Sequence, residues 1–505
     1  MSYSSLKKLK KQFDEEADEL IKEIQSEKKS YSNKLEELSK KTRIAKTINS
    51  KEINEFLDEP YVVVPAKQKE TWFVAVPKFV KMNLGWLDYS TETYNVFKIN
   101  KFMHWIGDIP KDIQHKFKFN DPLPLKVFDG MVLTGREHQE ATWNRYKNHL
   151  QQRKDKDKIK IKRGHEFKLL AQLIDDGMLP FIPQPIEKQD LRKGNLKFEL
   201  RDYQRTAWQK LRDTGATGVF WAYGAGKTFL ALHALEHVRV GDRPNFVTVP
   251  TTTLKEQWKK RIVELTENAK NDFLEEKLQI LTYQSFHKLQ NKKWGIGVMD
   301  EAHHLPANTY SRFATIDMKY RLGLSGSPHR EDGRTEYIFA LTGFPVGLSW
   351  DNLIELGVLE VPDIRVYLFS NWNEKTDKLE ELLAQDKKTI VFCDGIQKGK
   401  NLSKRFEIPF VSGETKNRIE TIESADKCIV SRVGDEGLSL PDIERVVEID
   451  FQFGSRRQEG QRLGRLFHSE ERGEHVILMT ETEFKDYGKR LKAIQERGFK
   501  LELIR

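Results

Sequence analysis

The sequence predicts an α/β fold in which two tandem lobes each contain a parallel sheet covered by helices. After residue 198, short β-branched runs alternate with amphipathic helical patterns, which is typical of parallel strands joined by crossover helices. The candidate strands form two sets, one on either side of residue 355. The chain has 505 residues, enough for roughly three or four domains. We expect lobe 1 over residues 191–355 and lobe 2 over residues 356–505.

The composition indicates a globular, mildly basic protein. Lys and Arg total 85 against 76 Asp and Glu, a net charge of +9, and aromatic residues make up 10% of the chain. The aromatic content argues against a wholly disordered chain. Two cysteines, Cys393 and Cys428, exclude a disulfide scaffold and fit a reducing compartment. We see no membrane span or secretory signal, so we expect an intracellular protein, cytoplasmic if prokaryotic or viral and nuclear if eukaryotic.

Residues 1–57 are predicted to form a charged helical segment. Its apolar residues recur at spacings of three and four, the mark of one helix stripe; these are Leu6, Leu9, Phe13, Ala17, Leu20 and Ile24. We favour a helix packed on its own protein over an intermolecular coiled coil, because few full heptads are present.

Residues 58–190 are predicted to form a basic and aromatic α+β accessory domain. Tyr61-Val-Val-Val64 and Trp72-Phe-Val-Ala-Val76 look like strands, and residues 141–168 are strongly basic. Strand alternation would place Lys158, Lys160 and Lys162 on one face, where they would hold phosphates. The alternative is a solvated surface strand. A polar linker is expected over residues 187–197, leading into lobe 1.

The strongest local signal is Trp221-Ala-Tyr-Gly-Ala-Gly-Lys-Thr228, between an apolar strand and a helix-forming run. A glycine-rich turn at a helix start directs backbone N–H groups onto phosphate oxygens. Lys227 would reach the β- and γ-phosphates and Thr228 would bind Mg²⁺, with Gly224, Ala225 and Gly226 forming the cradle. The usual first glycine is replaced by Trp221. The alternative is a glycine-rich turn with an incidental lysine.

A second candidate site, Asp300-Glu-Ala-His303, follows the apolar run that ends in Val298-Met299. Asp300 would hold Mg²⁺ through water, and Glu301 would orient and deprotonate the attacking water. His303 fits a coupling role, and His304 a structural one.

In motif order across about residues 198–470, the chain resembles helicase superfamily 2 and, within it, the XPB family of DNA translocases. The resemblance implies two RecA-like lobes with ATP and Mg²⁺ bound between them. Leu200-Arg-Asp-Tyr-Gln204 resembles the adenine-side motif, which implies nucleotide contacts by Arg201 and Gln204. Val249 to Trp258 resembles motif Ia, which implies that Thr251 and Thr252 grip the nucleic-acid backbone.

The resemblance assigns further roles in both lobes. Ser325-Gly-Ser327 resembles the coupling motif, and Arg330-Glu331-Asp332 matches an XPB element implied to engage DNA during unwinding. Ser431 to Gly437 resembles motif V, which implies that Gly437 lies near the nucleotide. Arg456 to Arg465 closely resembles motif VI. There Gln461 would face the γ-phosphate, Arg465 would act as an arginine finger and Arg462 would assist it.

Two departures from the family pattern bear on activity. His468 stands where motif VI usually has a further arginine, and only a short segment separates Asp332 from the strand that begins at Thr389. XPB-like proteins usually insert a helical thumb in that segment. A neutral imidazole at His468 supplies no permanent charge, so either Arg465, together with Arg462, suffices or hydrolysis is weakened. The missing thumb affects strand separation more than ATP-driven translocation.

We therefore expect an ATP-dependent DNA helicase or double-stranded DNA translocase of superfamily 2. Two alternatives stay open. One is a nucleotide-switched factor that clamps or remodels DNA without strand separation, and the other is an RNA helicase. The expected partners are nucleic acid, with DNA favoured over RNA, and a protein bound through the N-terminal region, without a membrane.

Overall fold

The computed structural model describes the secondary structure of most of the chain from residue 123 onward and of four strands before it. The chain divides into two compact units, Met1–Phe119 and Asn120–Arg505. The predicted helical segment 1–57 lies outside the described residues, and the predicted domain boundaries stay predictions. The described ranges are 62–65, 71–77, 87–90, 94–100, 123–151, 157–222, 224–266, 277–305, 311–326, 335–347, 361–415, 418–431, 443–451, 462, 466, 473–487, 491, 494 and 499–504.

The first unit contains a four-stranded antiparallel sheet in the order β1-β2-β4-β3. Its second strand alternates in burial, since Trp72, Val74 and Val76 are buried, which is the period-two pattern of a half-buried strand. Both strands predicted near residues 61 and 72 are confirmed. The strands are β1 (Val62–Pro65), β2 (Thr71–Pro77), β3 (Leu87–Ser90) and β4 (Tyr94–Asn100).

The second unit begins with a small module, residues 123–186, whose three strands are antiparallel in the order β5-β6-β7. Ile159 and Ile161 are buried while Lys158 and Lys160 reach the surface, so the predicted alternation is confirmed. The elements are β5 (Leu125–Phe128), β6 (Met131–Thr134), η2 (Arg136–His138), α5 (Gln139–Tyr146), β7 (Lys158–Lys160) and α6 (Glu166–Asp175).

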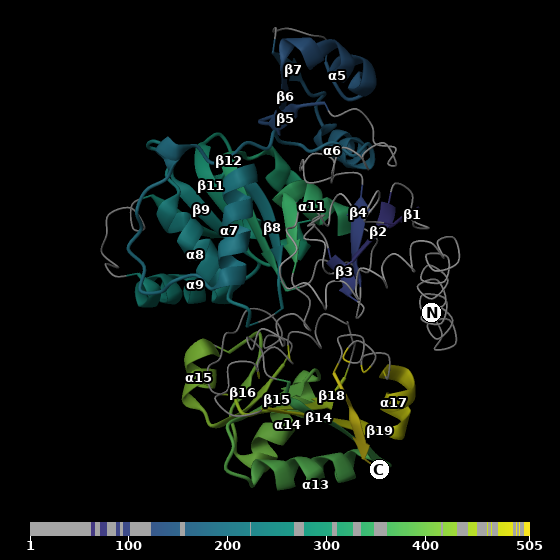
Figure 1. The fold of residues 1–505 in the computed structure, drawn as a ribbon. Helices are drawn as coiled ribbons and strands as arrows, with labels where there is room; N and C mark the ends of the chain where they lie inside the picture. The colour runs from purple at the N-terminus through teal and green to yellow at the C-terminus, as the bar shows by residue number, and fades with distance from the viewer. Residues whose placement is uncertain are drawn as a thin grey trace, which may run out of the picture. The chain divides into compact units, whose positions relative to one another are not determined.

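Lobe 1 is a six-stranded sheet in the order β10-β9-β11-β12-β8-β13, and every strand pair is parallel. Figure 1 shows helices α7, α8 and α9 on one face of this sheet. The strands are β8 (Ala216–Phe220), β9 (Asn245–Val249), β10 (Leu278–Thr282), β11 (Lys293–Met299), β12 (Asp317–Ser325) and β13 (Phe344–Gly347). The helices are η3 (Lys188–Asp190), α7 (Asp202–Thr214), α8 (Lys227–His237), α9 (Thr252–Leu265), η4 (Tyr283–Lys288), η5 (Ala302–His304), η6 (Ser311–Thr315) and α11 (Thr335–Thr342).

The strand order of lobe 1 positions its candidate site. Strands β9, β11, β12 and β8 are consecutive neighbours, and the carboxyl ends of parallel strands meet at one edge of a sheet. The residues that directly follow these four strands therefore lie along the same edge; they are Pro250, Asp300, Gly326 and Trp221.

Lobe 2 is a seven-stranded sheet in the order β16-β17-β15-β18-β19-β14-β20, again with parallel pairing throughout. The two parallel-sheet lobes confirm the predicted fold class. The strands are β14 (Asp363–Phe369), β15 (Thr389–Cys393), β16 (Phe410–Val411), β17 (Lys427–Val430), β18 (Arg445–Asp450), β19 (Glu474–Thr480) and β20 (Glu502–Ile504). The helices are α13 (Trp372–Leu383), α14 (Ile396–Phe406), α15 (Arg418–Ser424) and α17 (Glu481–Tyr487).

Both cysteines are strand residues of lobe 2, as predicted. Cys393 ends β15 and Cys428 lies in β17, and both are buried. Burial raises the pKa of each thiol to about 12, so neither forms a reactive thiolate near neutral pH.

The segment 187–197, predicted to be a polar linker, is instead tied to lobe 1. The Asp190 carboxylate is buried and accepts hydrogen bonds from the Tyr320 hydroxyl at 2.7 Å and the Lys319 ammonium at 2.8 Å. Polar sequence alone did not distinguish a solvated linker from a segment whose carboxylate is paired with β12.

The module and lobe 1 also meet through close contacts. The Lys126 ammonium pairs with Asp317, and the Arg321 guanidinium lies 3.8 Å from the centre of the Phe181 ring. At Gly215 the backbone has φ = +64°, and an added Cβ would lie 2.1 Å from the Gln184 carbonyl oxygen. This glycine is therefore required both by its conformation and by the close approach of the chain.

We predict that Gly215→Ala lowers the free energy of unfolding by about 3 kcal/mol, which combines left-handed backbone strain with overpacking. Gly130→Ala is the matched control, because Gly130 has φ = +73° and open space around its Cβ position. That control should lose only about 1 kcal/mol. Urea unfolding of both variants measures the difference, and equal losses would contradict the steric account.

Candidate nucleotide-binding site

The glycine-rich loop starts from the buried end of β8 and leads into α8. Trp221 and Ala222 are buried, whereas Gly224 and Gly226 have φ of +83° and +76°. An added Cβ on Gly226 would lie 2.5 Å from the amide nitrogen of Gln204. Left-handed residues in such a loop turn successive N–H groups toward one point, which forms an anion-binding concavity at a helix start.

Lys227, the first residue of α8, lies inside this loop. Its ammonium donates to the carbonyl oxygens of Trp221 and Ala222, both at 3.0 Å. Burial lowers the pKa of Lys227, and the neighbouring Glu301 and Asp300 carboxylates act in the opposite direction. A bound anion would further stabilise the charged ammonium. The loop, the lysine and Thr228 after it therefore fit a phosphate chain.

Asp300 follows β11 and has a fixed carboxylate. One oxygen accepts from the Trp258 indole N–H at 2.8 Å and the other from the Glu301 backbone N–H at 2.9 Å. The Tyr283 hydroxyl donates to the Asp300 carbonyl at 2.6 Å. Burial raises the pKa of Asp300, while the Trp258 hydrogen bond and Lys227 lower it. A carboxylate of this kind is stabilised by a cation, so it fits Mg²⁺.

Glu301 joins the acidic pair to the coupling residues. Its backbone has φ = +50°, a left-handed conformation that costs roughly 1–2 kcal/mol for a non-glycine residue. Its carboxylate lies 3.3 Å from His303 Nδ1, and the same nitrogen lies 3.0 Å from the Ser325 hydroxyl at the end of β12. The structure therefore brings Glu301, His303 and Ser325 together, as a coupling role requires.

The N-terminus of α7 is held against the glycine-rich loop. The Gln204 side chain accepts from the Arg201 backbone N–H at 2.8 Å and donates to the Gly226 carbonyl at 3.2 Å. The Tyr203 hydroxyl donates to the Ala225 carbonyl at 2.7 Å. Gln204 is therefore next to the loop, and its contact with a base stays a prediction.

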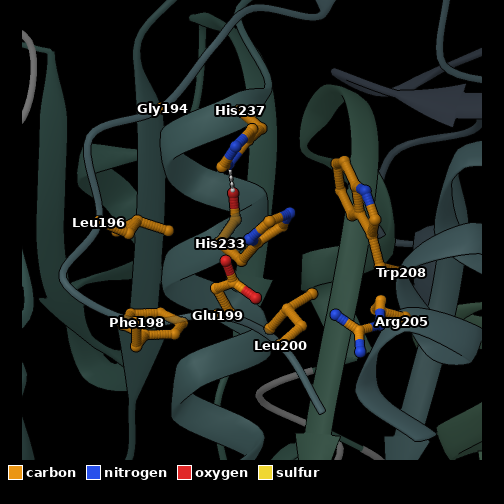
Figure 2. Close-up of a pocket in the computed structure, with 9 residues that line it drawn as sticks. All are labelled: Gly194, Leu196, Phe198, Glu199, Leu200, Arg205, Trp208, His233 and His237. Carbon is orange, nitrogen blue, oxygen red and sulfur yellow. Dashed lines mark hydrogen bonds between the residues drawn. The ribbon is translucent and has the colours of Figure 1, made fainter. Parts of the chain in front are cut away.

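A pocket of about 380 Å³ is lined by residues of α7, of α8 and of the segment before α7. Figure 2 shows Trp208 of α7 and His233 and His237 of α8 opposite the segment Gly194–Leu200. Burial and His237 lower the pKa of His233 to about 3, so this imidazole is neutral at physiological pH. None of the predicted phosphate- or metal-binding residues lines the pocket, whose lining is Gly194, Leu196, Phe198, Glu199, Leu200, Arg205, Trp208, His233 and His237.

The predicted nucleic-acid contacts occupy two places. The Thr251 hydroxyl accepts from the Leu254 backbone N–H at 3.2 Å and caps α9, with Thr252 exposed at the first helical position. The three lysines lie on the module, and the Lys162 ammonium donates to two carbonyls, those of Lys147 and Asn148, at 3.1 Å. The structure does not place these lysines in the phosphate-binding loop.

Of the predicted site residues of lobe 2, the structure describes Arg462. Its guanidinium is fully buried and donates to Glu448 at 2.5 Å and Asp394 at 2.8 Å, so both of these partners are carboxylates of the same lobe. Seven predicted site residues of the two lobes lie outside the described part of the chain; they are Ser327, Arg330, Glu331, Asp332, Gly437, Gln461 and Arg465.

Sequence reasoning gave no roles to three aromatic donors of lobe 1. Trp258, Tyr283 and Tyr203 each donate a hydrogen bond that fixes Asp300 or the loop. Tyr203 and Trp258 lie within the motifs at residues 200–204 and 249–258, and Tyr283 directly follows β10. The spacing of residues in a sequence does not show in which direction a buried aromatic ring points its N–H or O–H group. The sequence therefore contained these residues but could not predict their hydrogen-bond partners.

Two family models match the chain in order. Residues 197–330 match the res subunit of type III restriction enzymes, and residues 378–487 match the C-terminal helicase of ERCC3/RAD25/XPB. The first match covers most of the described sheet of lobe 1, and the second lies within lobe 2.

Similar proteins carry related names. The chain is 31% identical over 369 residues to the putative DNA 3'-5' helicase Rad25 of Halobacterium salinarum, covering 62% of this chain and 61% of that protein. It is 26% identical over 396 residues to the DNA 3'-5' translocase XPB2 of Sulfurisphaera tokodaii, covering 62% and 87%. For the DNA 3'-5' helicase XPB of Mycobacterium tuberculosis the identity is 27% over 332 residues, covering 56% and 60%.

The chain thus spans about three fifths of the length of the Halobacterium and Mycobacterium relatives. Two successive family models, each matching one parallel-sheet lobe, and relatives named Rad25 or XPB show that the chain resembles the XPB-like helicases of superfamily 2.

Proposed function

We propose that the protein is a DNA-dependent ATPase that acts as a DNA helicase or double-stranded DNA translocase. The observation that carries this proposal is that a half-buried lysine lies near two adjacent carboxylates, Lys227 near Asp300 and Glu301, at the sheet edge where β8 and β11 end. One cation and two anions in that position match the needs of a metal–triphosphate substrate. The names of the relatives support DNA as the polymer.

In this proposal the residues of lobe 1 divide the work on ATP. Lys227 and the backbone of Gly224–Gly226 bind the β- and γ-phosphates, while Thr228 and Asp300 hold Mg²⁺. Bound Mg²⁺ would neutralise charge on the phosphate oxygens. Glu301 orients the attacking water and takes its proton. Gln461 and Arg465 of motif VI complete the site, and Arg465 stabilises negative charge on the transferred phosphoryl group.

Glu301 also couples ATP hydrolysis to movement along DNA in this proposal. His303 contacts both Glu301 and Ser325, so a change in charge at the Glu301 carboxylate changes the hydrogen bond at the end of β12. Ser325 leads directly into Ser327 and then Arg330-Glu331-Asp332, the proposed DNA-engaging element. Movement then follows from differential DNA affinity in the ATP and ADP states.

The same proposal covers partners and location. Thr251 and Thr252 grip the phosphate backbone, with Lys158, Lys160 and Lys162 as a second contact. A protein partner bound through residues 1–190 is included, since the Antonospora locustae relative is named as a subunit of general transcription and DNA repair factor IIH. A protein acting on DNA would lie in the cytoplasm of a prokaryote or the nucleus of a eukaryote. No helix within the described residues has the length and apolar character needed to cross a membrane.

We predict that Lys227→Ala lowers DNA-stimulated ATP hydrolysis at least about 100-fold, because it removes a charge that stabilises the transition state. The control is Lys210→Ala, which removes a half-buried lysine from α7 and should leave turnover unchanged. Phosphate release with duplex DNA, with RNA and without nucleic acid is the measurement. Undiminished turnover in Lys227→Ala would contradict the assignment of this site to ATP hydrolysis. If RNA stimulates hydrolysis and DNA does not, the nucleic-acid substrate is RNA.

The same wild-type preparation distinguishes helicase from translocase. Separation of a forked duplex requires strand opening, whereas displacement of a third strand from a triplex requires only movement along the duplex. Activity on the triplex alone would identify a translocase. Activity on neither substrate, with ATP turnover intact, would favour the DNA-clamping factor.

We predict that Trp258→Phe moves the acid limb of the pH–activity profile upward by about one pH unit. The indole N–H stabilises the ionised carboxylate of Asp300, so its loss raises the pKa of the group that must be charged to hold Mg²⁺. Trp294→Phe is the matched control, because Trp294 is also buried in lobe 1 but donates to the Leu289 carbonyl. Superimposable profiles for the two variants would refute the role given to Trp258.

We predict that replacing Lys158, Lys160 and Lys162 together by Ala weakens DNA binding equally for all sequences. The slope of log K against log salt should become less steep by about two, since each phosphate contact contributes about 0.9 and Lys162 is bonded to carbonyls. The control replaces three exposed lysines, Lys188, Lys193 and Lys197, for the same change in net charge. An identical effect of both triple variants would favour the alternative, in which Lys158, Lys160 and Lys162 belong to a solvated surface and do not contact phosphates.

A further inference from the structure

Lobe 2 contains a fully buried cluster of charged side chains around Arg462. Its guanidinium donates through one nitrogen to Glu448 at 2.5 Å and through the other to Asp394 at 2.8 Å. The second oxygen of Glu448 lies 2.8 Å from His475 Nε2. The side chains of Arg462, Asp394, Glu448 and His475 are all fully inaccessible to solvent.

The partners of Arg462 come from three neighbouring strands of the lobe 2 sheet. Asp394 directly follows β15, Glu448 lies in β18 and His475 lies in β19, and these strands are consecutive in the sheet. The guanidinium also lies 4.5 Å from the centre of the Phe392 ring. Arg462 is therefore fixed against the most central part of the sheet by hydrogen bonds on two sides and by an aromatic face.

A second anchor lies four residues further along the chain. Leu466 is buried in an apolar cluster with Phe392, Val430 and Val446. In the sequence, Gln461 directly precedes Arg462 and Arg465 directly precedes Leu466. The interactions that fix Arg462 and Leu466 therefore also restrict the positions available to Gln461 and Arg465.

We propose that Arg462 is a positioning residue, which fixes motif VI on the lobe 2 sheet so that Gln461 and Arg465 meet the nucleotide in the reactive geometry. The inference rests on the proposed function, because it assigns a role within ATP hydrolysis. It replaces the expectation that Arg462 itself contacts the nucleotide. Removing the guanidinium from Asp394 and Glu448 to reach a ligand would leave two buried carboxylates without their cation, which is strongly unfavourable.

The test compares affinity in the ground state with affinity in the transition state for the full-length chain. Arg462→Lys keeps the positive charge but cannot donate to two carboxylates in a planar fork. We expect kcat to fall about 10- to 100-fold, since small displacements of reacting groups have effects of this size. Affinity for ADP should stay unchanged, and affinity for ADP with aluminium fluoride, a mimic of the transferred phosphoryl group, should fall by the same factor as kcat.

Arg405→Lys is the matched control. Arg405 also pairs with two carboxylates, Asp377 at 3.0 Å and Glu380 at 2.8 Å, but it lies exposed on α14. This variant should bind ADP and its aluminium fluoride complex as the wild type does. A loss equal to that of Arg462→Lys would show that any arginine–carboxylate fork of lobe 2 has the effect, and it would overturn the proposal.

The remaining outcomes are also decisive. Weaker ADP binding by Arg462→Lys with an unchanged kcat would make Arg462 a nucleotide ligand and overturn the proposal, as would no change in either quantity. If Arg462→Lys fails to fold, Glu448→Gln, which keeps Arg462 and Asp394 in place, must show the same separation between ADP and transition-state affinity. A wild type without nucleic-acid-stimulated turnover would refute the proposed function itself, so the two failures are distinguishable.

Discussion

The parallel pairing of lobe 1 is the constraint on which the candidate site depends. It puts the ends of β8, β11 and β12 at one edge, where the half-buried Lys227 lies near the buried Asp300 and Glu301. Burial lowers the pKa of the lysine and raises that of Asp300. A folded state that binds a proton at Asp300 more tightly than the unfolded chain does is most favoured at low pH, and this contribution is lost as the pH rises through the raised pKa. A bound cation would offset this loss of stability at higher pH, because it favours the ionised carboxylate of Asp300.

Aromatic donors make this electrostatic arrangement precise. Trp258 and Tyr283 fix Asp300 from two other elements, and Tyr203 ties α7 to the glycine-rich loop. The loop is therefore held by the strand before it, β8, by the helix after it, α8, and by α7, which carries Gln204. In the proposed function, such an arrangement would let phosphate groups bind without reorganising the site, which is the condition under which electrostatic stabilisation is most effective.

Much of the fold and the glycine-rich loop of the candidate site could be predicted from the sequence because they depend on local patterns. Apolar runs predicted the strands of both lobes, and the glycine pattern before Lys227 predicted a loop that the structure forms with two left-handed glycines. Long-range pairing could not be predicted. Nothing local shows that Asp190 meets Tyr320, that Trp258 points at Asp300 or that Arg462 is enclosed by Asp394 and Glu448, since each contact joins segments far apart in the chain.

The two lobes use buried charge in different ways. In lobe 1 the lysine and the acidic pair lie at a sheet edge where burial shifts the pKa values of Lys227 and Asp300, so a metal–triphosphate ligand would complete their electrostatics. In lobe 2 the charges around Arg462 satisfy one another within the protein. In the proposed cycle, charges completed by a ligand would respond to nucleotide binding and release, whereas a cluster completed internally would keep one geometry. The proposed translocase needs both properties. A change of charge at the nucleotide site produces directed movement only if another part of the protein stays fixed.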